Sequence, residues 1–388
     1  ILVATNGAGF AGSSFGSTNI VDRMLLADSR VDINDSGVVS IISEANNTKF
    51  SSALAYAGSE GIRAGFNGMK NSVFTRTKQL RRNLVSTAHS IPHEAFLLSN
   101  TNAPAGAMGP GDQNTILDMH VWMQYFNGQG TFDAQGDSYG FNLNNNGMTI
   151  GADRLLGEAL TVGFNYTYAR ADGRTSNKDT IETETYYIGA YSEWVSEGGL
   201  YIDALAAYGA SNYESVRLED NYRGTAKYRG NDVGAYADMG QYYYYKNLSI
   251  SPYIGLHTLF VMAESHTETD EIGGSKVLVD ESTRTWIESA LGLKARHRFD
   301  TRKGRFQTTG FAEWTHDFKQ DEIASTLSSG NIGPLSMAKI SPDADTLNAG
   351  AGLSWICTDY LEVGIGYNGR FSDRYEEHTG SIMFDIRF

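Results

Sequence analysis

The residues that come closest to an acid–base site in this chain stand together in GFAEWTHDF, residues 310–318. A carboxylate beside a histidine can orient the imidazole and stabilise its charge, as in many hydrolases. The segment, however, alternates like a β-strand, in which neighbouring side chains point to opposite faces. His316 then shares a face with Trp314, whereas Glu313 and Asp317 lie on the other face. Because parity separates the histidine from both acids, we expect no catalytic residue here.

The other reactive groups are isolated or lie in polar segments. Cys357 is the single cysteine, so the chain has no internal disulfide, and no cysteine–histidine cluster suggests a metal site. The acidic segment 264–282 offers Glu268, Asp270 and Glu271 as calcium ligands, but runs of charge are usually solvated. No serine–histidine–aspartate spacing and no phosphate-binding loop appears elsewhere. We therefore predict no enzyme activity, no cofactor and no metal.

Composition narrows the class of protein. The 388 residues include 43 Gly and 22 Tyr against 6 Pro, and the mean hydropathy is −0.33 although aromatic residues make up 12%. This balance suits strands that are apolar on one face and polar on the other. The net charge of −14 argues against a nucleic-acid partner. No window approaches the roughly 18 apolar residues of a membrane-spanning helix. Because the chain opens on Ile1 rather than Met, we expect a fragment of a longer precursor.

From about residue 113 to its end, the chain consists of long segments in which apolar and polar residues alternate. These segments would position the side chains of GFAEWTHDF and of the other motifs. In LTVGFNYTY, residues 160–168, even-numbered positions are apolar and odd-numbered positions are polar or glycine. LEVGIGYNGRF, residues 361–371, repeats the pattern. About twelve such segments follow one another, and they are centred near residues 120, 145, 164, 187, 206, 235, 254, 289, 312, 349, 365 and 382.

The gaps between these segments alternate in length. Short turns such as 196–199 separate longer polar stretches, among them 170–180, 215–225 and 264–283. An antiparallel up-and-down β-barrel that crosses an outer membrane has this alternation of turns and loops. A soluble β-sandwich or β-helix remains the alternative. We predict an all-β membrane protein with a barrel of about 12 strands.

The chain ends on a strand, SIMFDIRF. Closing a barrel requires the last strand to pair with the first, and lipid-facing side chains must be apolar. The segment fits both needs, because one parity is apolar and the other is polar or small apart from Met383. The residues of the apolar parity are Ile382, Phe384, Ile386 and Phe388.

One stretch, residues 52–86, has the periodicity of a helix. Ile62, Phe66, Met69 and Val73 recur at spacings of three and four, which marks an apolar stripe. A second stripe consists of small residues: Ala57, Gly61, Gly65, Gly68 and Ser72. Glycine inside a helix costs roughly 1 kcal/mol relative to alanine. We therefore expect this helix to be held in a narrow lumen or closely packed on a neighbour.

The charge of this stretch supports a place inside a pore. It carries one acid, Glu60, and six cationic side chains: Arg63, Lys70, Arg76, Lys78, Arg81 and Arg82. Acids assigned to the inward parity of the strands are the expected partners of these cations, because pairing in a confined pore is screened little. These lumen acids are Glu182, Glu184, Glu313 and Glu362. The alternative is a solvated basic face near lipopolysaccharide phosphates.

Several motifs resemble those of one family in the expected order. They are VWMQYFNGQG (121–130), NGMTIGAD (146–153), LTVGFNYTYA (160–169), GFAEWTHDF (310–318) and SIMFDIRF (381–388). Over residues 113–388 the chain resembles the C-terminal translocator barrel of classical (type V) autotransporters. The motifs look like the family's first strand, its glycine–aspartate hairpin, its glycine-centred third strand, a tryptophan–histidine strand near the end and the terminal signature.

The resemblance implies an outer-membrane protein that anchors an N-terminal passenger and supports its export to the bacterial cell surface. It implies a pore filled by a helix, and contacts with lipopolysaccharide and with the machinery that reads the terminal signature. Residues 1–51 would be a passenger tail or junction, 52–112 the helix and a linker at least partly in the pore, and 113–388 the barrel. The Pro- and Gly-containing segment 100–113 marks the last boundary.

Other interpretations stay open at this stage. The pair Asn46-Asn47 resembles the cleavage site of self-cleaving autotransporters, although it stands much farther before the first strand than in that subfamily, and we expect an ordinary polar turn. An outer-membrane barrel enzyme of protease or lipase type would need converging acid and histidine or serine residues. A plain porin or adhesin barrel would not need the N-terminal extension with its basic helix.

Overall fold

The computed structural model describes residues 29–33, 39–43, 52–90, 119–136, 138–157, 159–219, 222–271, 276–301, 304–319, 326–329, 332–336, 340–358 and 361–387. Asn46, Asn47 and Phe388 lie outside these ranges. In the described part of the chain, no helix is both long enough and apolar enough to cross a membrane.

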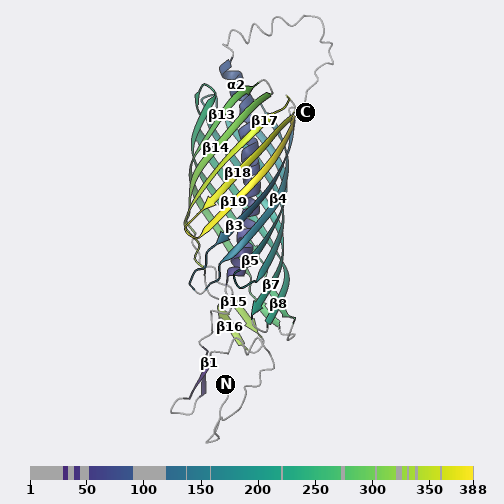
Figure 1. Ribbon diagram of the computed structural model, residues 1–388, viewed down its shortest axis with the longest axis vertical. Helices are drawn as coiled ribbons and strands as arrows, with labels where there is room; N and C mark the ends of the chain where they lie inside the picture. The colour runs from purple at the N-terminus through teal and green to yellow at the C-terminus, as the bar shows by residue number, and fades with distance from the viewer. Residues whose placement is uncertain are drawn as a thin grey trace, which may run out of the picture.

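A closed antiparallel β-barrel forms the body of the protein (Figure 1). Within the described ranges it has twelve long strands: β3 (Met119–Phe132), β4 (Phe141–Leu156), β5 (Leu160–Thr175), β6 (Thr180–Val195), β7 (Leu200–Glu219), β8 (Tyr222–Gln241), β10 (Leu248–Ala263), β13 (Ser282–Thr301), β14 (Gly304–Asp317), β17 (Asp345–Ile356), β18 (Leu361–Phe371) and β19 (Tyr375–Arg387). Each long strand pairs with the next long strand, and β19 pairs with β3 to close the ring. The predicted barrel is confirmed.

Side chains alternate between the lumen and the outside along these strands. On β5, Phe164 and Tyr166 are exposed outward, whereas Asn165 and Thr167 are buried inward. Phe164 is 70% exposed, which suits contact with lipid rather than water. The pattern follows from the two-residue period of a strand, and closure leaves no strand edge unpaired in the membrane.

The two ends of the barrel differ. We call the end where β3 begins and β19 ends the turn end; there, short connections such as 157–159 and 196–199 join the strands. The opposite, loop end carries the shorter strands β11 (His266–Asp270), β12 (Lys276–Val279), β15 (Thr326–Ser329) and β16 (Ile332–Ser336). Three further short strands are β1 (Ser29–Ile33) and β2 (Val39–Ser43), which pair with each other, and β9 (Tyr243–Tyr245).

Three segments predicted as long loops are largely strand. β5 and β6 are joined by 176–179 alone, and β7 and β8 are separated only by 220–221. β7 and β8 pair up to Glu219 and Tyr222, so this ladder runs past the apolar positions into polar sequence. Likewise, 264–283 contains β11 and β12. Backbone pairing with a neighbouring strand overrides the polar composition that suggested loops.

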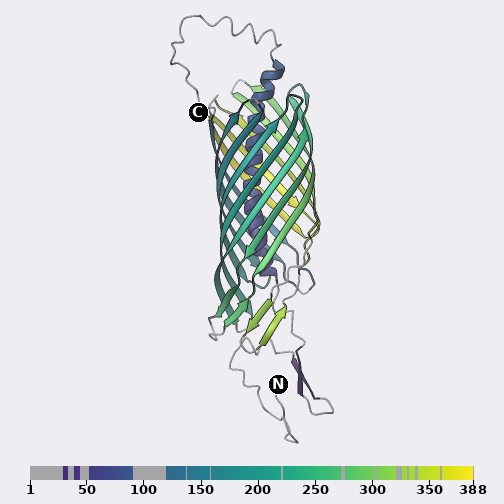
Figure 2. The same ribbon diagram turned by 180° about the vertical axis from the view of Figure 1, so that it is seen from behind.

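Within the described ranges one long helix, α2 (Ala53–Ser90), runs through the barrel from the loop end to the turn end (Figures 1 and 2). It extends slightly beyond the predicted range of 52–86. α2 lies mainly against β4, β5 and β6, with further contacts to β3, β7 and β10. A helix inside a barrel buries its whole circumference, which explains why Ile62, Met69 and Val73 are fully buried.

The small-residue stripe of α2 faces the nearest wall of the barrel. A Cβ added to Gly61 would lie 3.0 Å from the Cβ of Ala171, and one added to Gly65 would lie 2.8 Å from the Cβ of Ala169. At Gly68 the added atom would meet the ring of Phe126 at 2.5 Å. These positions therefore need glycine because the wall touches the helix backbone, as the sequence pattern predicted.

Candidate functional site

Among the described side chains of α2, Arg76 forms the most extensive polar contact with the barrel. Its Nε and Nη2 donate to the two carboxylate oxygens of Asp153 on β4, at 2.8 and 3.0 Å, and its Nη1 donates to Asp385 on β19 at 2.6 Å. The guanidinium is 1% exposed. A buried cation held by two carboxylates through three donors is well compensated, so the contact fixes the position of the helix.

Two aromatic side chains orient the carboxylate of Asp153. The hydroxyl of Tyr191 on β6 donates to Asp153 Oδ2 at 2.8 Å, and Trp122 Nε1 on β3 donates to that hydroxyl at 2.8 Å. All of these groups point into the lumen and are buried. The network therefore joins α2 to four strands: β3, β4, β6 and β19.

A second group lies nearer the loop end, around Glu60 and Arg63 on α2. Arg63 pairs with Glu60 at 3.4 Å and with Glu288 on β13, and it stands 5.1 Å from the ring centre of Trp286. Glu60 Oε2 accepts a hydrogen bond from Arg370 on β18 at 2.7 Å. This charged group attaches the helix to the side of the barrel opposite its closely packed wall.

A third group surrounds Lys294, which points inward from β13. Its Nζ lies 3.2 Å from Asp238 Oδ2 and 4.3 Å from the ring centre of Phe74 on α2. Asp238, His257 and Glu313 offer ligand atoms that all lie within 4.8 Å of one another, as a metal site would require. The ammonium of Lys294 already supplies a cation to this cluster.

Two of the four predicted lumen acids are in the lumen. Glu313 and Glu362 point inward and are buried. Glu313 accepts from the hydroxyl of Tyr253 at 2.7 Å and from Asn348 at 3.3 Å, both of which are barrel residues. Whether these two acids also act on the helix cations stays a prediction.

The prediction for Glu182 and Glu184 is wrong, because both lie on the outer face of β6. They surround Arg170 of β5, which is 2.7 Å from Glu182 and 3.9 Å from Glu184. Their parity is that of Tyr186 and Ile188, two exposed apolar residues farther along the same strand. The acids face outward because β6 extends beyond its apolar stretch toward the loop end, where the outer face is polar.

The acids that were considered as calcium ligands, although no metal was predicted, lie at the loop end and have basic neighbours. Glu268 is buried and pairs with Arg217 at 3.2 Å, and Glu271 pairs with Arg223 at 2.9 Å. Asp270 Oδ1 accepts from the backbone N–H of Arg223 at 3.3 Å. Basic side chains therefore compensate the charge that a calcium ion would otherwise balance.

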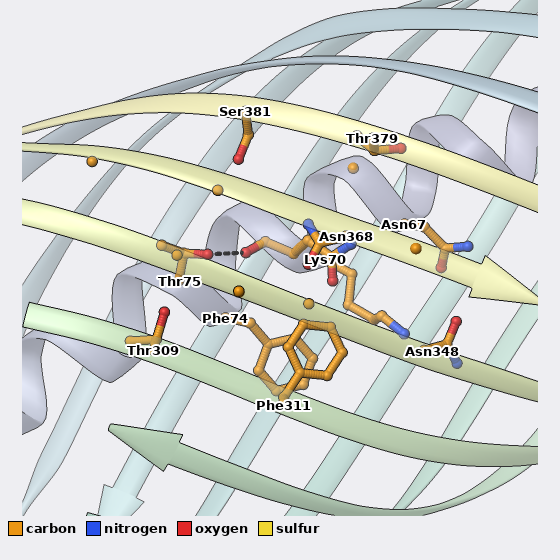
Figure 3. A pocket seen from close by; sticks show the side chains of 18 of the residues that line it. Asn67, Lys70, Phe74, Thr75, Thr309, Phe311, Asn348, Asn368, Thr379 and Ser381 are labelled. Atoms are coloured by element: carbon orange, nitrogen blue, oxygen red, sulfur yellow. Dashed lines mark hydrogen bonds between the residues drawn. The ribbon is translucent and has the colours of Figure 1, made fainter. Parts of the chain in front are cut away.

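The remaining helix cations divide into two sets. Lys70 faces a cavity between α2 and the strands β14, β17, β18 and β19 (Figure 3). The side chains of Lys78, Arg81 and Arg82 lie outside what the structure describes. The cavity offers about 100 Å³ for the centres of water molecules, and amides and hydroxyls such as Asn348, Asn368 and Thr379 line it. Apolar side chains such as Phe74 and Phe311 line the cavity as well, and a partly polar space of this size has room for water.

The terminal strand is placed as its alternation predicted. Ile382, Phe384 and Ile386 are exposed on the outer face of β19, whereas Met383 and Asp385 point inward and are buried. β19 pairs with β3 along its length, from Tyr375 opposite Phe132 to Arg387 opposite His120. The terminal segment is therefore part of the closed ring.

Sequence reasoning missed the acids that bind the helix arginines, namely Asp153, Asp385 and Glu288. Signals for two of them were present. Asp153 ends the NGMTIGAD motif, and Asp385 occupies an inward position of the terminal strand. Glu288 carries no comparable signal, because only the register of β13 and the depth of α2 bring it to Arg63.

Comparisons with known proteins agree with this geometry. Residues 121–368 match a family model described as the autotransporter β-domain. The chain is 23% identical over 304 residues to outer membrane protein A of Rickettsia conorii, an alignment that covers 73% of this chain and 15% of that protein. The chain thus spans a small part of the length of that relative.

Solved structures show the same fold. The chain is similar to the translocator domain of autotransporter NalP from Neisseria meningitidis, with a TM-score of 0.58 and 16% identity, covering 82% of this chain and 98% of that one. It is also similar to the β-domain of the Bordetella autotransporter BrkA, with a TM-score of 0.52 and 16% identity, covering 70% of this chain and 100% of that one.

Proposed function

The chain belongs to the autotransporter β-domain family, and on that premise we propose a role in export for each of its parts. It is the translocator β-barrel of an outer-membrane autotransporter. In our proposal, residues 1–51 are a passenger tail or junction, residues 52–112 are a helix and linker at least partly in the pore, and residues 113–388 are the translocator. The passenger itself precedes these segments.

One observation carries the proposal that α2 closes the pore after export. The helix is enclosed by the barrel, and it is bound to strand residues at two levels through Glu60 and Arg76. A segment that merely passed through would not need buried ion pairs with the wall, because each such pair requires desolvation and exact partners. We therefore assign α2 a lasting place as the plug of the pore.

We propose that the loop end faces the cell exterior and the turn end faces the periplasm. Barrels of this class have short periplasmic turns and longer extracellular loops, and the short connections lie at the turn end. α2 begins at the loop end, so the passenger that precedes it would lie outside the cell. The outward acids Glu182 and Glu184 near the loop end would then lie in the lipopolysaccharide region.

The remaining parts of the proposal concern partners and chemistry. The outward residues Ile382, Phe384 and Ile386, together with Phe388, would form the signature that the outer-membrane assembly machinery reads. The barrel itself would carry no enzyme activity, and Asn46-Asn47 would be an ordinary turn. The separation of His316 from Glu313 supports this, because the two side chains lie on opposite faces of β14.

Single-channel conductance tests the plug directly. Removing residues 52–112 should raise the conductance of the barrel in planar bilayers, because the lumen then fills with electrolyte. Removing residues 1–51 is the matched control and should leave conductance unchanged, since α2 stays in place. A folded barrel is verified for each variant by its altered mobility when the sample is not boiled. Equal conductance of the two variants would place residues 52–112 outside the pore and refute the proposal.

The orientation is tested by protease added to intact cells. Cleavage should occur in the loop-end segments 264–282 and 318–344 and not in the short turns. Cleavage of the short turns with the loop-end segments intact would reverse the orientation proposed for the barrel.

A further inference from the structure

The pairing of β19 with β3, which we call the seam, joins the two ends of the barrel sequence. Its backbone ladder runs from Tyr375 opposite Phe132 to Arg387 opposite His120, like the ladders of the other strands. Its lumen face also carries side-chain contacts that reach beyond the paired strands. At two levels, inward side chains of β19 and of β4 are linked to each other across the intervening strand β3.

The first link lies toward the turn end and passes through α2. Asp385 on β19 and Asp153 on β4 are both buried, and the guanidinium of Arg76 binds both. Between them, β3 contributes His120, whose Nδ1 is 3.6 Å from Asp385, and Trp122, which reaches Asp153 through Tyr191. Without Arg76, two buried carboxylates would face one another over β3 and repel each other.

The second link lies toward the loop end. Asn145 on β4 donates to Glu377 on β19 at 2.8 Å, and Glu377 pairs with Arg370 at 3.1 Å. Arg370 in turn donates to Glu60 of α2. The side chains can meet because β3 has glycine there: a Cβ on Gly128 would lie 2.8 Å from Asn145 Oδ1 and 2.4 Å from Thr379 Oγ1.

We propose that α2 bridges the seam from inside and keeps the first and last strands of the barrel paired. Arg76 supplies the cation that lets β19 and β4 approach over β3, and Glu60 supports the arginine that holds Glu377. Occupation of the lumen by the helix and closure of the ring then stabilise each other. Lys70 is different, because it faces the cavity and, among the described residues, forms no ion pair with β3, β4 or β19.

Amide hydrogen exchange on the folded, full-length chain in detergent tests this coupling. Replacing Arg76 with methionine should speed exchange in β3 and β19 by about tenfold or more, while β10 and β13 keep their protection. Lys70→Met is the matched control, since it removes a cation of the same helix and should leave the seam protected. Adding Asp385→Asn to Arg76→Met should restore part of the seam protection, because it removes the repulsion between the two acids.

Other outcomes would overturn the inference. Faster exchange spread evenly around the barrel, or confined to α2, would mean that Arg76 anchors the helix without acting on the seam. Equal seam exchange in the Arg76→Met and Lys70→Met variants would also mean that Arg76 does not act on the seam. If the Arg76→Met chain does not fold, Arg76→Lys provides the test, because a lysine keeps the charge but cannot bind Asp153 with two donors. Wild-type seam protection in Arg76→Lys would then contradict the bridge.

Discussion

On one side of α2 the barrel wall touches the helix backbone, and on the other side the wall stands away from it. The packed wall, β3 to β8, meets the helix glycines directly, as at Gly65 and Ala169. The hollow wall, formed by β14, β17, β18 and β19, is separated from the helix by the cavity that Lys70 faces. Small residues line both walls, but only those of the packed wall touch the helix.

This difference shows that small residues have two uses in the lumen. Gly364 on the hollow wall has only ordinary contacts around an added Cβ, the nearest atom being 3.5 Å away. Gly163 on the packed wall would place its Cβ 2.3 Å from the ring of Tyr191. Gly163 makes room for the ring of Tyr191, and Gly350 on the hollow wall does the same for Phe311, 2.4 Å from an added Cβ, whereas Gly364 leaves room beside the cavity. The helix is therefore held on one side by close packing together with polar contacts, and on the other side by long charged side chains.

The largest expected loss of stability comes from removing a large side chain at the packed wall. Phe66 fills the space over Gly234 of β8, where an added Cβ would lie 2.2 Å from its ring. Phe66→Ala should destabilise the barrel by about 3–5 kcal/mol. The neighbouring change Asn67→Ala, at the cavity, should stay within about 0.5 kcal/mol. The measurement is the temperature at which unboiled samples lose the mobility of the folded form, and similar midpoints for both variants would remove the distinction between the walls.

A smaller loss of stability is expected when a glycine of the helix is replaced by a larger residue. Gly65→Leu would force the wall near Ala169 and Tyr187 to move, which typically costs about 1–3 kcal/mol. The gain in helix propensity offsets roughly 1 kcal/mol of this. Asn71→Leu places the same side chain toward the cavity and should be nearly neutral. The midpoint of heat unfolding distinguishes them, and a lower midpoint for Asn71→Leu than for Gly65→Leu would reverse the assignment of the walls.

The sequence predicts the packed wall better than the hollow wall, for a physical reason. The small stripe at Gly61, Gly65 and Gly68 is visible because helical period and side-chain size are properties of one segment. Strand parity is equally local, and it places Ile382 and Phe384 correctly. The prediction failed at Glu182 because the polar end of β6 was assigned to the lumen. Glu182 has the same parity as Tyr186, which is exposed on the outer face.

Partners across the lumen are not local properties. Arg76 meets Asp153 and Asp385 only because the registers of β3, β4 and β19 bring these acids to one level and α2 stands at the matching depth. The cavity depends on the helix lying off centre, which follows from the glycines of one helix face together with the small residues of the opposite wall. A pattern along the chain can indicate that cations enter a pore, but it does not fix which acids they meet.

The smallest expected effect is on the ion selectivity of the plugged barrel, through a charge at the hollow wall. Among the residues that the structure describes, no carboxylate forms an ion pair with Lys70, and its side chain borders the partly polar cavity. A charge beside a water-filled path attracts ions of opposite sign. Lys70→Glu should therefore make the residual conductance of the plugged barrel more cation-selective, with a shift of a few millivolts in reversal potential under a salt gradient.

Lys70→Gln is the intermediate variant and should shift the reversal potential in the same direction by less. Stability should change little in either variant, because the side chain makes no buried ion pair among the described residues. A matched charge change on the outer face, Lys227→Glu, should leave selectivity unaltered, since Lys227 lies outside the lumen and is 76% exposed. If the Lys70 and Lys227 variants shift the potential equally, ions do not pass along the hollow wall, and the cavity is a closed space within the plugged barrel.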